Sequence, residues 1–206
     1  MKTPGSILLV LLAFIGCAST PPDFSAFHEA SPRSILVVPA ANKSLDVDAP
    51  NYLLSTLPVP LAEKGYYVFP VNTVKFLLEQ EGFYEGEQIH AQPASELAQL
   101  FNADAILYVT INRWDAKYTI LSAVVTVEFH YIMVDRNGNE IWNVLKTMQY
   151  QPQNTNSGNP LANLVTSLVS AAITRAAPNY LPLTRQANSE TISTGNMAIP
   201  NGPYRN

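Results

Sequence analysis

The 206-residue sequence has little cysteine, little charge and no familiar catalytic motif. Its single cysteine, Cys17, cannot form an intramolecular disulfide. Only 14% of the residues are charged, and the net charge of -4 gives no support for nucleic acid or an anionic surface as a partner. The hydrophobic fraction of 47% is large enough to form a core, and the length fits one domain with flexible ends.

Catalytic frames are also missing. The nine glycines are scattered, and none follows a predicted strand at the spacing of a phosphate-binding loop. Ser44, Ser55 and Ser122 stand outside a Gly-x-Ser-x-Gly frame, so a hydrolase triad would have no nucleophile elbow. We therefore expect a protein that is not an enzyme and that binds no cofactor.

The apolar stretch at residues 7–15 is shorter than the roughly twenty residues that a membrane-spanning helix needs. It follows Lys2 and has the length of the apolar region of an export signal. The stretch ends in Phe-Ile-Gly-Cys at residues 14–17, which resembles the lipobox of bacterial lipoproteins, although Phe14 replaces the usual Leu. The resemblance implies cleavage after residue 16 and acylation of Cys17, palmitate included. An ordinary signal or anchor with an incidental cysteine is the alternative.

In the convention of lipoproteins, a residue other than Asp after the cysteine, here Ala18, implies transfer to the outer membrane. Several acyl chains would hold the protein there stably, and we expect it to face the periplasm. Residues 17–33, rich in Pro, Ser and Ala, are predicted to be the lipidated cysteine and a loose tether. Residues 34–183 are predicted to form the globular domain, and 184–206 a disordered polar tail.

The domain is predicted to alternate strands and helices. Short β-branched runs predict strands, and apolar residues at helical spacing, with their caps and stops, predict helices. Two alternating runs flank Asn137-Gly138, a strong hairpin signal. Together they predict an α/β or α+β fold with one mixed sheet of about five strands flanked by helices. The predicted strands cover 34–39, 66–69, 104–111, 118–134 and 140–150; the predicted helices cover 48–57, 71–81, 93–101 and 160–176; and 83–92 is predicted to be a loop.

Two stretches carry a resemblance to known families. Residues 49–56 and 60–71 resemble the signature of a family of uncharacterised bacterial lipoproteins, some of which are surface-antigen candidates. Residues 97–109 are similar to a helix-into-strand pattern in the N-terminal domain of the translocation protein TolB and in the curli-secretion lipoproteins. The resemblance implies a lipid-anchored domain with a TolB-N-like fold, possible homodimers, and an accessory role in envelope transport or secretion. It supplies no catalytic residues.

A metal site is the main chemical alternative. Glu128 and His130 are two residues apart in a predicted strand, so they share a face and could bind a metal. A third ligand would be needed, such as His90 or Asp135, and no spacing motif links them. An exposed polar strand face explains the pair as well. His28 and His90 fall in predicted loops and are expected to be solvated.

Two further groups are weaker candidates. Asn42, Asp46 and Asp48 alternate as calcium ligands do, but the glycine and the final glutamate of a calcium loop are absent. A helix cap explains Asp48 better. The Tyr66-Tyr67 pair and Trp114 could line a binding surface, although aromatic residues in strands usually pack in the core.

The favoured hypothesis is a non-enzymatic, membrane-anchored periplasmic lipoprotein that acts as an adaptor in an envelope transport or secretion complex. Its expected partners are the membrane, through Cys17, and envelope proteins, with a possible homodimer and no nucleic acid. The alternatives are an activator of a cell-wall synthase, and a periplasmic metal-binding protein or enzyme that uses Glu128 and His130.

Overall fold

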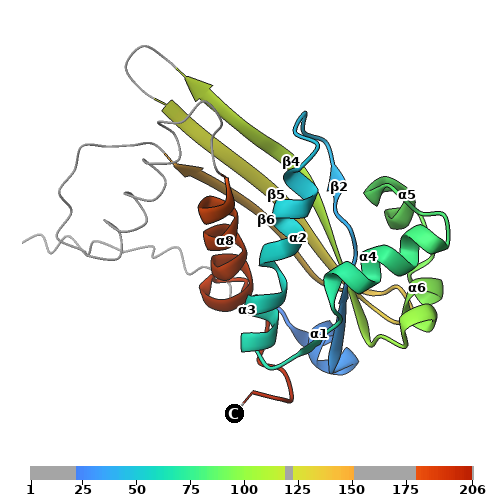
Figure 1. The fold of residues 1–206 in the computed structure, drawn as a ribbon. Helices are drawn as coiled ribbons and strands as arrows, with labels where there is room; N and C mark the ends of the chain where they lie inside the picture. Colours follow the sequence, from blue (N-terminus) through green and yellow to red (C-terminus); the bar gives the residue numbers. More distant parts are fainter. Residues whose placement is uncertain (1–21, 119–122, 151–179, 206) are drawn as a thin grey trace, which may run out of the picture.

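The computed structural model describes residues 22–118, 123–150 and 180–205. One mixed sheet runs through the molecule, with its strands in the order β3-β1-β4-β5-β6 and β2 beside β4 (Figure 1). β1 pairs in parallel with β3 and β4, whereas β4, β5 and β6 are antiparallel. The six strands of the described residues are β1 (Ser34–Val37), β2 (Ala41–Asn42), β3 (Tyr67–Val68), β4 (Ala105–Tyr118), β5 (Ala123–Asp135) and β6 (Glu140–Tyr150). The predicted mixed α/β fold is confirmed, with one strand more than expected.

Helices cover both faces of the sheet around β1. Those on one face are α2 (Ala49–Thr56), α3 (Pro58–Glu63) and α8 (Leu181–Ser189), and those on the other are α4 (Val71–Gln80), α5 (Gly86–His90) and α6 (Ala94–Phe101). The apolar side chains of β1 and of the next residue, Val38, alternate between these two cores: Ile35 and Val37 face the first, and Leu36 and Val38 the second. This double burial explains why β1 is a continuous apolar run.

The hairpin signal is also confirmed. β5 and β6 are joined through Gly138, whose positive φ of 89° favours glycine. The inward side chains of β5 are those expected from the alternation, and they are fully buried: Val125, Val127, Phe129, Tyr131 and Met133. α2 and α3 follow one another directly, because Pro58 and Pro60 can only begin a new helix there.

The tether prediction is wrong for the described part of residues 17–33. A short helix, α1 (Ser25–Ala30), occupies the segment that was expected to be loose. Phe27 is buried at one end of the core, edge-on to the ring of Tyr66 at 6.2 Å. A single well-buried aromatic ring therefore docks a segment whose composition resembles a linker. The loop prediction at 83–92 is wrong as well, because Ile89 is buried and α5 forms around it.

The prediction of a disordered tail from residue 184 is also wrong. α8 continues into the π-helical turn η1 (Glu190–Thr194), and the chain then packs along the domain to Arg205. Leu183, Ala187, Ile192 and Ile199 are buried in the first core. Polar composition does not imply disorder here, because Thr184, Asn188 and Thr191 are also buried, each with a hydrogen-bond partner.

Three predictions lie outside the described residues: the signal at 1–16, acylated Cys17 and the helix at 160–176. Within the described residues, no helix is long and apolar enough to cross a membrane.

Candidate functional site

The candidate site lies beyond the carboxyl end of β1, where the chain can turn to either face of the sheet. In open α/β sheets, ligands and partners are commonly received at such a switch point. Here the chain forms β2 and then a turn, residues 43–48, before α2 begins. We call this turn the docking loop. In Figure 1 it lies at the upper ends of β2 and α2, away from α1 and the carboxyl terminus of the chain.

A cage of hydrogen bonds fixes the docking loop. The backbone N–H and the hydroxyl of Ser44 donate to Asn42 Oδ1 at 3.0 and 2.7 Å, and Asn42 Nδ2 donates to the Asp46 carbonyl at 2.8 Å. Asp46 Oδ1 accepts from the backbone N–H of Asp48 at 2.9 Å, and its Oδ2 accepts from the indole N–H of Trp114 at 3.0 Å. The loop is thus tied to itself and to β4.

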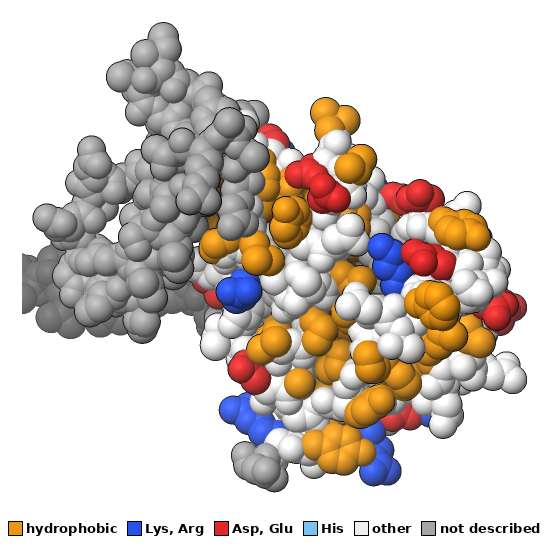
Figure 2. Space-filling view, viewed as in Figure 1, with side chains coloured by type: hydrophobic (Ala, Val, Ile, Leu, Met, Phe, Trp, Pro, Cys, Tyr) orange, Lys and Arg blue, Asp and Glu red, His pale blue; other side chains and the backbone are white. Residues whose placement is uncertain are grey.

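Two apolar side chains project from this rigid loop. Leu45 is fully exposed at 102%, and Val47 is 84% exposed. Figure 2 shows hydrophobic side chains standing out at the top of the molecule, over this loop. Tyr52, stacked on Trp114 with ring centroids 6.0 Å apart, and Tyr84 add exposed aromatic surface nearby. Isolated exposed apolar residues are ordinary, but a set presented by a preorganised loop is typical of protein interaction sites.

A cleft of about 350 Å³ lies beside the docking loop. Val47 and Tyr84 form its apolar rim, and Lys75 and Glu85 supply charge. Lys75 donates to Asn51 Oδ1 at 3.2 Å, and Glu87 accepts from the backbone N–H of Asn42 at 2.7 Å. The α5 backbone approaches so closely here that a Cβ at Gly86 would lie 2.1 Å from the Ala40 carbonyl oxygen. The cleft therefore has fixed walls.

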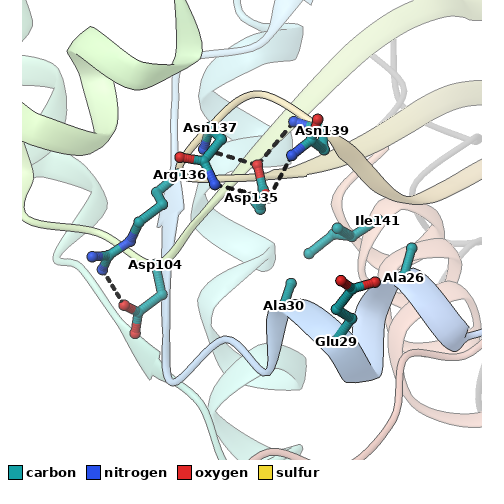
Figure 3. A pocket seen from close by; sticks show the side chains of 9 residues that line it. All are labelled: Ala26, Glu29, Ala30, Asp104, Asp135, Arg136, Asn137, Asn139 and Ile141. Atoms are coloured by element: carbon teal, nitrogen blue, oxygen red, sulfur yellow. Dashed lines mark hydrogen bonds and ion pairs between the residues drawn. The ribbon is translucent and has the colours of Figure 1, made fainter.

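A second, polar pocket of about 590 Å³ lies between α1 and the β5–β6 turn (Figure 3). Asp104 forms an ion pair with Arg136 at 2.5 Å, and Asp135 accepts hydrogen bonds from Asn137 and Asn139. Partial burial would raise the pKa of both carboxyls, but these hydrogen bonds, with those of Arg33 and Ser34 to Asp104, keep each pKa below its ordinary value. Both aspartates already have partners, so they hold the turn in place and are not free for a ligand.

The proposed metal ligands share a face, as predicted, but they bind neighbours on β6. His130 Nε2 lies 2.8 Å from Asn143 Oδ1, and Glu128 accepts from the Thr147 hydroxyl at 2.9 Å. The suggested third ligand, His90, instead bonds the Pro39 carbonyl at 3.1 Å. No group of three His, Cys, Asp or Glu side chains in the described parts of the chain could hold a metal ion.

His90 is partly buried and not solvated as expected, with its ring edge-on to Tyr108 at 5.0 Å. The expected capping role of Asp48 is wrong, because its side chain makes no capping hydrogen bond and the Asp46 carboxylate binds the loop backbone. Tyr66 and Trp114 are core residues, whereas Tyr67 is half exposed.

Sequence reasoning missed Leu45 and Val47. The oxygen-bearing side chains of Asn42, Asp46 and Asp48 suggested a cation loop. The functional candidates are instead the apolar residues Leu45 and Val47. The polar side chains of the loop form hydrogen bonds within the protein, and the apolar side chains are left exposed to solvent.

A family model described as "Putative lipoprotein GNA1162-like" matches residues 22–204. The chain belongs to this family. The matched span includes α1 and the segment after α8, so the regions predicted to be a tether and a disordered tail belong to the family's domain.

A relative in the same family, "Putative lipoprotein NMB1124/NMB1162" of Neisseria meningitidis serogroup B, is 38% identical over 174 residues, or 82% of this chain and 79% of the relative. The crystal structure of lipoprotein GNA1162 from Neisseria meningitidis is 39% identical, with a TM-score of 0.58 over 70% of this chain and 100% of that one. The PelC dodecamer from Paraburkholderia phytofirmans is 17% identical, with a TM-score of 0.48 over 87% of this chain and 96% of that one.

Proposed function

We propose that the protein is a lipid-anchored, non-enzymatic adaptor that docks an envelope protein through its docking loop. The observation that carries this proposal is the exposure of Leu45 and Val47 on a loop fixed by the Asn42–Ser44–Asp46 cage. A preorganised loop loses little conformational entropy on binding, so less of the favourable free energy of its apolar contacts is offset. The neighbouring cleft offers a shaped wall for the same partner.

Membership of a lipoprotein family and the lipobox-like residues 14–17 support an anchor at Cys17. Several acyl chains hold a protein on a bilayer stably, whereas one chain binds only marginally. Ala18 after the cysteine supports the outer membrane, with the domain on the periplasmic side. The partner would then be a component of an envelope transport or secretion complex, and its identity would separate this role from activation of a cell-wall synthase.

The test compares two double variants in the full, lipidated protein. L45S/V47S removes apolar surface from the docking loop, and L100S/L145S removes it from α6 and β6, where both leucines are also exposed. Gentle crosslinking in cells, followed by mass spectrometry, should recover a defined envelope partner with the wild type and the control, and lose it with L45S/V47S. Retention of the same partner by L45S/V47S would overturn the proposal.

A further inference from the structure

The end of the molecule opposite the docking loop carries a cluster of basic and aromatic side chains that the adaptor role does not use. Three separated segments build it: Arg33 after α1, the turn from Lys64 to Tyr67, and the chain end at Tyr204 and Arg205. We call this set the basic end. Figure 2 shows Lys and Arg side chains along this lower end of the molecule.

The basic end is internally ordered. Arg33 donates to the Tyr204 hydroxyl at 3.1 Å, and its guanidinium lies 5.8 Å from the centre of the Tyr204 ring. Lys64 and Arg205 both donate to the side-chain oxygen of Asn201. These contacts hold three cationic side chains in place without neutralising them.

The backbone beneath these side chains is clamped. The N–H of Gly202 donates to the Lys64 carbonyl at 2.7 Å, and the N–H of Tyr204 donates to the Gly65 carbonyl at 3.0 Å. A Cβ at Gly65 would lie 2.3 Å from the backbone nitrogen of Arg205, so the two segments approach as closely as glycine permits. The chain end is therefore fixed to the turn after α3.

No ion pair among the described residues includes a cationic side chain of the basic end. Their ion pairs join Arg136 to Asp104 and Lys146 to Glu190, and neither includes Arg33, Lys64 or Arg205. The exposed carboxylates of Glu29 and Glu63 pair with none of the three. Burial lowers the pKa of Lys64, and the positive charge of Arg205 lowers it further.

Tyrosine side chains border the charge. Tyr67 and Tyr204 are each about half exposed. Tyrosine with lysine and arginine is the combination found where proteins meet the headgroup layer of a membrane, because the ring is partly apolar and the hydroxyl stays hydrated.

The short link between Cys17 and α1 would hold the bilayer close to α1 and the basic end. Cys17 precedes Pro22 by five positions, which span at most about 18 Å when the chain is fully extended. α1 begins at Ser25 and is packed onto the domain by Phe27. A cleft of about 390 Å³ joins α1 to Arg33 and to residues 200–203, so the basic end adjoins the helix that follows the anchor.

We propose that the basic end lies against anionic phospholipid headgroups and so turns the docking loop away from the bilayer. The proposal rests on the acylation of Cys17 in the proposed function. Three cationic side chains near an anionic surface favour the docked orientation by on the order of a hundredfold, at about 1 kcal/mol each. The interaction is also salt-dependent, because exposed charges are screened.

The experiment uses the full, lipidated protein in phosphatidylethanolamine vesicles with or without phosphatidylglycerol. A nitroxide is attached at P203C in the basic end or at V47C in the docking loop, both exposed, and a nickel-chelating headgroup lipid reports its distance from the surface. Acylation blocks the thiol of Cys17, so the label is unique. The neutralised variant is R33Q/K64Q/R205Q, and R113Q/K117Q/R185Q, which lies outside the basic end and the docking loop, is a control with the same net charge.

We expect nickel-induced relaxation to be stronger at residue 203 than at residue 47, and stronger with phosphatidylglycerol. R33Q/K64Q/R205Q should abolish the difference, and the control should keep it. Equal relaxation at both sites, or relaxation unaffected by phosphatidylglycerol, would overturn the proposed orientation. Flotation of the wild type but not of C17S tests the anchor separately, so a failed anchor and a wrong orientation give different results.

Discussion

At the scale of single residues, buried polar side chains decide which segments of this protein are ordered. Asn188 of α8 accepts from the Tyr131 hydroxyl at 2.5 Å and donates to Thr56 Oγ1 at 2.6 Å. All three side chains are buried, and burial raises the pKa of Tyr131 well above its ordinary value, so its hydroxyl remains a donor. This network joins the segment after residue 180 to β5 and α2.

Asn188→Leu should therefore lower the free energy of unfolding by about 1–3 kcal/mol, because it leaves the Tyr131 hydroxyl buried without this acceptor. Urea denaturation measures the change. Adding Tyr131→Phe should recover part of the loss, since both partners are then apolar. A double variant whose losses simply add would contradict the proposed network.

His90 gives the protein a pH dependence in mildly acidic solution. Burial lowers its pKa below the ordinary 6.5, against the opposing effects of the Pro39 carbonyl and Glu87. The unfolded chain then binds the proton more readily, so the contribution of His90 to stability is present above pH 6.5 and is lost as the pH falls below it.

Urea denaturation of the wild type should show falling stability across that window, and His90→Gln should flatten the slope while keeping a donor for Pro39. His28→Gln, on the exposed side of α1, is the control and should keep the wild-type slope. An unchanged slope in His90→Gln would contradict the assignment.

At the scale of elements, glycine allows the chain end to pack against the turn after α3. Gly65 and Gly82 have nearly equal positive φ values, 89° and 91°, but only Gly65 faces the backbone of Arg205. Gly65→Ala should destabilise by the backbone cost of about 1–2 kcal/mol plus a packing cost of about 1–3 kcal/mol. Gly82→Ala should show the backbone cost alone.

Limited proteolysis distinguishes the two variants further. Gly65→Ala should expose the segment after η1 to cleavage, because Gly202 and Tyr204 lose their carbonyl partners on the turn. Equal stability and equal cleavage of the two variants would contradict the clamp.

The elements that could be predicted from the sequence are those in which local pattern and burial agree. β1 and β5 follow their apolar patterns, α4 and α6 follow their helical spacing, and Gly138 marks the hairpin. α1 and the region after Thr184 could not be predicted in this way. Their order depends on one ring, Phe27, and on polar side chains whose partners lie far along the chain.

The role of the docking loop could not be predicted from the sequence for a related reason. Asn42, Asp46 and Asp48 suggest a cation loop from their residue types, but the sequence does not show that Asp46 turns inward to Trp114. The role of Leu45 depends on that geometry.

At the scale of the whole molecule, the two ends have different surface chemistry. The docking loop presents apolar side chains at one end, and the basic end presents cations and tyrosines at the other, beside α1. A lipid anchor ahead of α1 would use this polarity, because the end near the bilayer and the end that meets a partner would be different surfaces.

Substitutions in the exposed docking loop and in the buried core should differ in their effect on the free energy of unfolding. Leu45→Ser should change the free energy of unfolding by no more than about 0.5 kcal/mol, since the side chain is fully exposed. Leu53→Ala, in the buried face of α2, should cost about 2–5 kcal/mol. Chemical denaturation of both variants checks this, and a large loss in Leu45→Ser would show that the loop has a structural role.

The most direct test of the adaptor role is site-specific photo-crosslinking in cells. A photoreactive residue replaces Leu45 in the lipidated protein, and a second version carries it at Leu100, an exposed position on α6. We expect position 45 to capture one defined envelope protein, position 100 to capture none of it, and Cys17→Ser to abolish the adduct. Capture of that protein from position 100 but not from position 45, or no adduct at position 45, would contradict the account.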